Sequence, residues 1–222
     1  MRTTSGTAAT AAPTGAERAA STRERILDAA ERLFAERGLD NVSHRQIAAA
    51  AGQGNVSAVN YHFGTTADLV RAIVRRHGEL VEALRARWVD EALVSDELRA
   101  WVSCLIHPVA EHLESLGSPT WWARFTALVA TDPRYRELIA TELEQSDGLS
   151  RTASALARLA ARLPEPVRLE RGEMTRLLAV HVFAQRETAL ADGTPVARAT
   201  WRGSADGIVD ATVGLWQAEV TG

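Results

Sequence analysis

The sequence has no lysine and a single cysteine, Cys104, among its 222 residues. One cysteine excludes an intrachain disulfide and any metal site built from several thiolates. No run of about eighteen apolar residues exists that would predict a transmembrane helix, and the first residues lack the charged-then-apolar pattern of a secretory signal. These absences predict a cytoplasmic protein without a membrane partner.

Strand signals are also scarce. Few β-branched stretches alternate apolar and polar residues, and the 7 prolines and 15 glycines gather in short breaks. Apolar residues instead recur at helical spacing, and 46% of the residues are hydrophobic, which is enough for a sizeable core. The predicted fold class is all-α.

Charge is divided unevenly along the chain. Residues 18–78 hold nine arginines and six acidic residues, whereas residues 79–222 hold fifteen arginines and twenty-one acidic residues. A basic N-terminal part on an acidic remainder favours a small nucleic-acid-binding module attached to a body that binds something else. Without lysine, phosphate contacts must come from arginine, hydroxyl, amide and backbone N–H groups.

The N-terminal segment, residues 1–20, is rich in Thr, Ala, Ser and Gly and has no apolar periodicity, so we predict a disordered tail. Ser21 and Glu24 have the spacing of a capping box and predict the start of the first helix, which Gly38 ends.

Two short helices follow over residues 43–63. Ser43 with Gln46 predicts a capped start and Gly52 a tight turn. Asn55 is the expected N-cap of a second short helix that ends near His62, with Val56, Val59 and Phe63 facing inward. Two short helices joined by a glycine-containing turn are typical of a helix-turn-helix, although a generic helical hairpin has the same pattern.

Further helices are expected to the end of the chain. Thr65 and Asp68 predict a capped helix that reaches Leu93. The later helices are expected over residues 96–116, with Pro108 opening the helix locally, and over 119–131, 133–163 with a weak point at Asp147-Gly148, 168–191 and 200–220.

Residues 22–74 resemble the N-terminal domain of the tetracycline-repressor (TetR/AcrR) family of bacterial regulators. The matching stretches are TRERILDAAERLFAERGLDNVSHRQIAAAAG and VSAVNYHFGTTADLVRAIV. The resemblance implies a three-helix DNA-binding domain over residues 21–66 and a helical effector-binding and dimerisation domain over residues 67–222. It also implies a homodimer, formed through residues 168–191 and 200–220, that represses transcription from a palindromic operator in double-stranded DNA.

The same resemblance assigns the DNA contacts. Arg45 occupies a position that reaches a base edge, and arginine is the best bidentate reader of guanine. The full predicted set is Thr22, Ser43, His44, Arg45, Asn55, Val56, Ser57, Asn60, Tyr61, His62 and Thr66.

Three departures from the family pattern bear on these contacts. The turn Gln53-Gly54-Asn55 is one residue longer than usual, so the residue of the next helix that faces a base stays open. Asn60 replaces a phosphate-binding tyrosine, and its amide suits adenine. Thr66 replaces a lysine and retains only a hydroxyl and a backbone N–H for phosphate.

The resemblance also implies that a small, largely apolar effector binds in the second domain and releases the DNA. Large aromatic and a few polar residues on two successive predicted helices form a mixture typical of ligand pockets, although the aromatics alone also suit a core. The candidate effector-binding residues are Trp101, Cys104, His107, Trp121, Trp122, Arg124 and Phe125. No cofactor and no metal is expected.

Other classes of protein fit less well. The chain has no lysine for a phosphate loop, no Gly-x-Ser-x-Gly elbow and no His-Glu-x-x-His motif, so an enzyme is not expected. A helical enzyme, or a metal or thiol sensor using Cys104 and His107, is the alternative. A purely structural helical partner leaves the DNA-reading residues unexplained.

Overall fold

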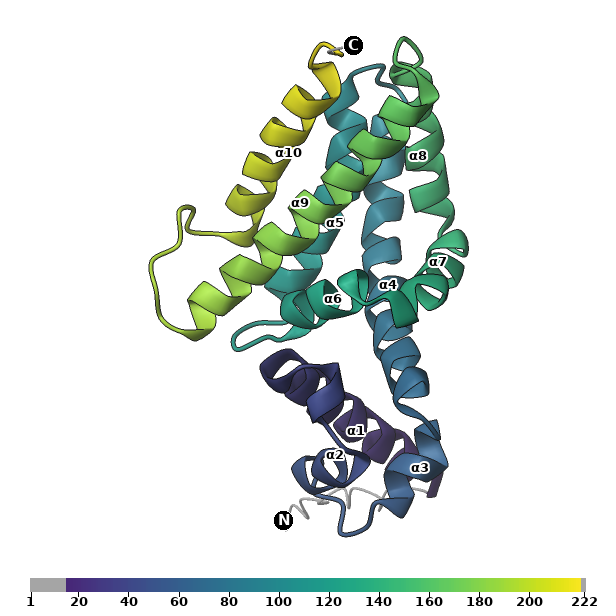
Figure 1. Cartoon of the computed structure of the whole chain (residues 1–222), viewed down its shortest axis with the longest axis vertical. Coiled ribbons are helices and arrows are strands. Elements are labelled where there is room, and N and C mark those ends of the chain that lie inside the picture. Colours follow the sequence, from purple (N-terminus) through teal and green to yellow (C-terminus); the bar gives the residue numbers. More distant parts are fainter. Residues whose placement is uncertain (1–14, 221–222) are drawn as a thin grey trace, which may run out of the picture.

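The computed structural model describes residues 15–220, and within that range it contains helices and no strand. The all-α prediction is confirmed (Figure 1). The elements are α1 (Gly15–Arg37), the 3-10 turn η1 (Leu39–Asn41), α2 (His44–Ala50), α3 (Ser57–Phe63), α4 (Thr66–Ala92), α5 (Leu98–Ser115), α6 (Trp122–Thr131), η2 (Pro133–Tyr135), α7 (Arg136–Glu144), α8 (Asp147–Leu159), α9 (Glu165–Ala191) and α10 (Trp201–Gln217).

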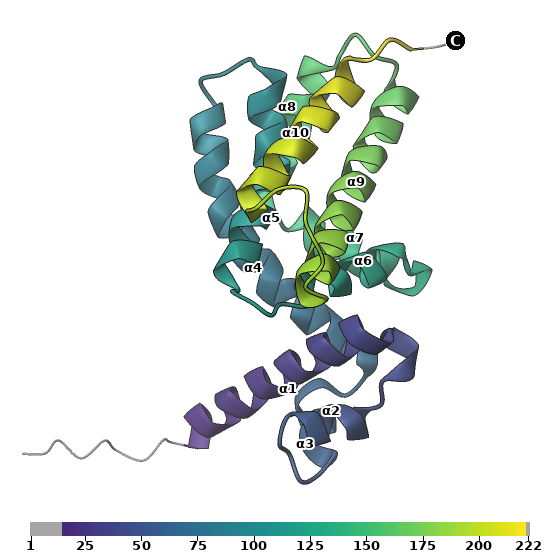
Figure 2. The same cartoon turned by 90° about the vertical axis from the view of Figure 1, so that its left-hand side faces the viewer.

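The helices form a small unit and a larger body. Helices α1 to α3 lie at one end, and α4 runs from this end into the body, where it packs along α5 (Figure 1). Helix α5 also packs on α10 and α8, while α6 crosses the base of the body, between α9 and α1. Figure 2 shows α9 and α10 antiparallel on one face. No helix within residues 15–220 is long and apolar enough to cross a membrane.

Two predicted helix starts are confirmed in atomic detail. The Gln46 side chain accepts a 2.8 Å hydrogen bond from the Ser43 backbone N–H, and the Ser43 hydroxyl accepts one from Gln46 N–H, which completes a capping box. Thr65 and Asp68 form the equivalent box at the start of α4. These i to i+3 pairs satisfy backbone donors that a helix leaves unpaired at its first turn.

The predicted start of the first helix is wrong. Helix α1 begins at Gly15, so Ser21 lies inside it and not at its N-cap. Residues 16–20 consist of Ala, Glu and Arg, which are strong helix formers, and they continue the helix although their side chains are exposed. The predicted disorder is therefore wrong for residues 15–20, and residues 1–14 lie outside the described residues.

Pro108 lies inside α5 and has a partner in α4. Because proline has no N–H, the carbonyl of Cys104, four residues earlier, loses its helical hydrogen bond. The buried guanidinium of Arg85 donates from Nη1 to this carbonyl. The place that we expected Pro108 to open is thus occupied by Arg85, which joins α4 to α5.

Candidate DNA-binding interface

The turn between α2 and α3 is built by Gly52. Gly52 has φ +67°, and its N–H bonds to the Ala49 carbonyl while Gln53 N–H bonds to the Ala48 carbonyl over 2.8 Å. These two bonds form the Schellman motif that ends many helices, and the left-handed residue it needs favours glycine. The motif turns the chain sharply after α2 and so positions α3.

Helix α3 starts later than predicted. The Asn55 side-chain oxygen accepts hydrogen bonds from the Ser57 N–H at 2.9 Å and from the Ser57 hydroxyl at 2.8 Å, and the helix begins at Ser57. Asn55 therefore forms a turn before the helix, and the N-cap is Val56, one residue later than predicted.

One face of α3 packs inward and the other is free. Val59 and Phe63 are buried, as predicted, whereas Val56, also expected to pack inward, is 37% exposed because it precedes the first helical residue. The predicted contacts of this segment lie on the outer side: Asn55, Val56, Ser57, Asn60 and Tyr61 are exposed, and His62 is half-buried. Tyr61 is 85% exposed, so its ring is available to a partner.

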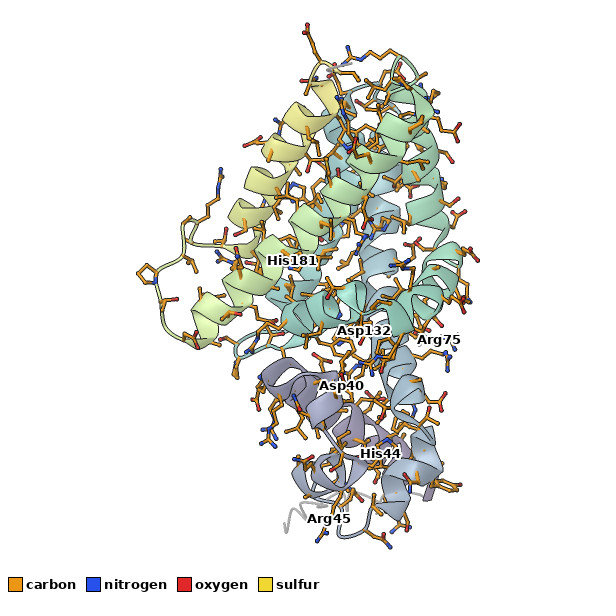
Figure 3. All side chains as sticks on the ribbon, viewed as in Figure 1. Asp40, His44, Arg45, Arg75, Asp132 and His181 are labelled. Atoms are coloured by element: carbon orange, nitrogen blue, oxygen red, sulfur yellow. The ribbon has the colours of Figure 1, made fainter. Side chains whose placement is uncertain are left out.

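The start of α2 lies at the same end of the molecule. Arg45 is exposed and lies, with His44, at the end remote from α9 and α10 (Figure 3). The Ser43 side chain is exposed but is engaged in the capping box with Gln46. Arg45 is therefore the long cationic side chain that α2 presents at this end.

His44 and Asn60 connect the two helices. His44 Nδ1 lies 2.8 Å from the Asn60 Oδ1, so the ring N–H donates to the amide oxygen. One lone pair of the amide oxygen is thereby used, and the amide nitrogen is left to donate. A bidentate reading of adenine by Asn60 would have to use the second lone pair of this oxygen together with the amide nitrogen.

The two remaining predicted DNA contacts flank this surface. Thr22 lies half-buried on α1 and accepts a weak 3.4 Å bond from Arg25, while Thr66 is the half-buried first residue of α4. At that position a backbone N–H has no partner within its own helix and suits a phosphate.

Sequence reasoning missed Arg23. Its guanidinium lies 5.2 Å from the centre of the Phe63 ring and joins α1 to α3.

The predicted effector-binding residues on α5 lie in the core. The Trp101 indole donates to the Ser95 carbonyl at 3.1 Å, and the His107 ring stacks on Trp88 at 4.5 Å. The Cys104 thiol contacts the carbonyls of Trp88 and Ala100 at 3.3 Å, and burial raises the pKa of this thiol to about 11. A thiol held in its neutral form is a poor nucleophile and a poor metal ligand.

The residues predicted on α6 pack toward the small unit or toward α9. The Phe125 ring stacks on Phe34 of α1 at 6.2 Å, Trp122 packs on two histidines, and Arg124 pairs with Glu187 at 3.1 Å. Trp121 is half-buried at the N-cap of α6.

Two surface depressions lie elsewhere. One of about 310 Å³ follows α9 from His181 to Asp192 and Thr194, and one of about 300 Å³ lies between η1 and the end of α6, beside Asp40 and Arg134. Neither is lined by the predicted effector-binding residues. Across residues 15–220, no three His, Cys, Asp or Glu side chains converge as metal ligands, so Cys104 and His107 belong to no such group.

Helices α2 and α3 have the arrangement of a helix-turn-helix, and the long helix α4 joins them to a larger helical body. Residues 26–73 match the family model for bacterial regulatory proteins of the tetR family. The N-terminal unit therefore matches the DNA-binding domain of this family, which confirms the resemblance drawn from the sequence over this segment. No curated protein matches the chain at a significant level.

Solved structures share the fold. AmtR of Mycobacterium smegmatis aligns with a TM-score of 0.59 and 20% identity over 90% of this chain and 87% of its own. A tetR family regulator from Shewanella sp. PV-4 aligns at 0.57 and 16%, over 88% and 95% of the two chains. LfrR of M. smegmatis, solved with proflavine, aligns at 0.51 and 25%, over 90% and 98%.

Proposed function

We propose that this chain is a repressor that binds a palindromic operator as a homodimer in the cytoplasm and leaves it when a small, largely apolar effector binds the body. We place the DNA-binding domain at residues 21–66 and the effector-binding and dimerisation domain at residues 67–222, with α4 joining the two. We propose no enzymatic activity for this chain.

The observation that carries the DNA-binding part is the outer side of α2 and α3. It combines a cationic side chain with hydroxyl, amide and phenol groups on two helices at one end of the molecule (Figure 1), namely the exposed Arg45, Ser57, Asn60 and Tyr61. Such groups donate to phosphates and base edges in the major groove. The test is selection of random duplex DNA on the purified chain, followed by sequencing. A palindromic motif supports the proposal, and recovery of unenriched sequence contradicts it.

Dimer formation is supported by exposed apolar residues of α9. Leu169, Met174 and Leu190 are large apolar side chains that remain exposed in the single chain. A two-fold copy covers such a surface and also brings two recognition helices to two half-sites.

Met174→Arg, at a residue 43% exposed, tests this proposal because it should leave the chain folded. Light scattering should give twice the chain mass of 24.0 kDa for the wild type and a lower mass for the variant. Arg151→Glu, on the distant and exposed surface of α8, is the control. A wild-type mass near that of one chain contradicts the proposal.

Effector release is supported by the likeness to LfrR, whose structure holds proflavine. In this chain most of the candidate effector-binding residues are buried against other residues of the body and of α1, so a ligand among them must bind a conformation in which α5 and α6 have moved. Such a ligand shifts the DNA equilibrium by its difference in affinity between the two conformations.

Planar cationic and neutral aromatic compounds, screened by quenching of the six tryptophans, test this part of the proposal. Each hit is then added to the operator gel-shift. A compound that quenches and releases DNA supports effector control, and quenching without any change in DNA binding contradicts it.

A further inference from the structure

A cluster of charged and polar side chains lies where the small unit meets the body. It consists of Glu31 on α1, Arg76 and His77 on α4, and His112 on α5, and we call it the junction cluster. His77 Nε2 lies 2.7 Å from Glu31 Oε2, and His77 Nδ1 lies 2.7 Å from His112 Nε2. Arg76 Nη2 donates to the same Glu31 oxygen at 2.6 Å.

The flat face of His77 is also engaged. The Trp122 ring of α6 stacks on His77 with 4.9 Å between centroids and 18° between planes, and it meets His112 edge-on at 4.7 Å. Both ring nitrogens and one face of His77 are therefore occupied by partners on three other helices. Glu31, His77 and His112 are buried, and each of these residues is at most 5% exposed.

The charge at the junction is balanced across α1 and α4. Arg76 also donates to Asp28 at 2.7 Å and to Glu24 at 3.3 Å, both on α1. The groups that face His77 are therefore Glu31, with Asp28 and Glu24 behind it, from α1, Arg76 from its own helix, His112 from α5, and the uncharged Trp122 from α6.

A contribution to the stability of the fold does not by itself explain why such a buried polar cluster is present. Removing charges from water costs free energy that ion pairing only partly offsets, and apolar residues of similar volume often stabilise a protein as well or better. What hydrogen bonds add is direction, because they are satisfied at one geometry only. The neighbouring Phe34–Phe125 stack has no such requirement and tolerates sliding of the two rings.

We propose that His77 is a positioning residue that sets the orientation of the α1–α3 unit on the body, and that operator affinity depends on this orientation. The imidazole holds Glu31 of the DNA-binding unit in register with His112 and Trp122 of the body. Loss of the imidazole leaves Glu31 attached only through Arg76, which lies at the edge of the cluster and is longer and more flexible. The proposal rests on the DNA-binding function of the chain.

The test measures orientation and DNA binding separately. Spin labels are placed at Ala49→Cys on α2 and Ser150→Cys on α8, both exposed, while the native Cys104 is buried. Labelled chain is diluted into unlabelled chain so that pulsed electron resonance reads the distance within one chain. Operator affinity is measured on the same samples by fluorescence anisotropy.

His77→Phe keeps a ring for Trp122 and removes both hydrogen bonds. We expect a broadened or shifted distance distribution without DNA, and operator binding weaker by about tenfold or more. Glu31→Leu should have the same effect from the other side of the junction, and it keeps the test open if His77→Phe fails to fold. Glu31→Gln retains an oxygen that accepts from His77 and should stay within about threefold of the wild type.

Ile208→Val in α10 is the control for general loss of stability, because Ile208 is buried in the body. It should lower the melting temperature without changing the distance distribution. A wild-type distance distribution in His77→Phe or Glu31→Leu overturns the proposal, whatever the affinity. A changed distribution with unchanged affinity overturns its functional half. If the wild type itself binds no selected DNA, the proposed function fails while the distance measurement still decides the role of His77.

Discussion

The carboxylate of Glu187 in α9 caps the N-terminus of α6 by accepting hydrogen bonds from Arg124 and its neighbour Ala123. One oxygen of Glu187 accepts from the Arg124 backbone N–H at 2.9 Å and from its Nε at 3.1 Å, and the other accepts from Ala123 N–H at 3.1 Å. Helix α6 has no side-chain cap of its own at Trp121. A residue far along the chain therefore supplies the cap that sequence-local residues provide for α2 and α4.

Glu187→Ala should destabilise the protein strongly. Glu187 is only 1% exposed, so the change leaves buried backbone and guanidinium donors without an acceptor, at a cost of about 2–4 kcal/mol. Urea unfolding followed by circular dichroism measures it. Glu187→Gln keeps one acceptor oxygen and should lose less. Equal losses in the two variants would mean that the side chain acts by packing and not as a cap.

Arg45→Ala should weaken operator binding by about 1–3 kcal/mol and relax sequence preference at one position in each half-site. The exposed side chain leaves the fold unaffected. Arg151→Ala on α8 makes the same change in net charge away from the interface, so any loss it shows measures the general electrostatic term. Anisotropy titrations at two salt concentrations separate the two effects. Tyr61→Ala should also weaken binding without lowering the melting temperature.

Asn60→Asp distinguishes the scaffold role of Asn60 from its DNA-facing role. An aspartate oxygen still accepts from His44, so α2 and α3 remain joined and the melting temperature should hold. The added negative charge replaces a donor on the DNA side, so operator affinity should fall at least about tenfold. Retained affinity would show that Asn60 does not face the DNA.

Acid should destabilise the junction cluster. Burial, reinforced by the charge of His77, lowers the pKa of His112 from 6.5 to about 4. Between these pH values the unfolded chain takes up a proton that the folded chain does not, so the free energy of unfolding falls as the pH drops from 6.5 to 4. The loss is on the order of 3 kcal/mol.

Glu31 adds to this loss at lower pH. Burial raises its pKa, but the hydrogen bond and charge of His77, together with Arg76, outweigh burial and hold the pKa below 4.5. Its contribution to the free energy of unfolding is present above pH 4.5 and disappears as Glu31 is protonated.

Urea unfolding at a series of pH values tests the role of His112. The free energy of unfolding should change less steeply with pH between 6.5 and 4 in His112→Gln than in the wild type, and an identical slope would contradict the assignment.

Arg85 and Pro108 should show coupled effects on stability. Pro108→Ala restores a backbone N–H for the Cys104 carbonyl, which then no longer needs the guanidinium. Arg85→Met should therefore cost less in the Pro108→Ala background than in the wild type, with a coupling energy of about 1–2 kcal/mol. Additive losses would show that Arg85 acts through its pairing with Glu82 alone.

The sequence predicted features whose cause is local. The boxes at Ser43 and Thr65 are set by side chains three residues apart, and Val59 and Phe63 pack inward because of helical periodicity. The prediction at Ser21 was wrong because a capping pattern inside a run of helix-forming residues does not start a helix. The two short helices were therefore readable from the residues alone, whereas the family resemblance was needed to distinguish a helix-turn-helix from a generic helical hairpin.

Features made by distant residues were not readable. Glu31, His77 and His112 are separated by 46 and 35 positions, and each looks like an ordinary polar residue on its own helix. The aromatic residues on α5 and α6 suited both a pocket and a core, and only the packing of α6 against α1 and α9 shows where their side chains lie. Whether an effector separates them is still a prediction.

The unbroken course of α4 gives the molecule a mechanical property. Its 27 residues form a rod of about 40 Å with one end at the recognition helix and the other inside the body. A swing of roughly 5° about the far end moves the near end by about 3.5 Å, close to the rise of one base pair. In the proposed dimer, a swing of this size would move each recognition helix by about one base pair relative to its half of the operator.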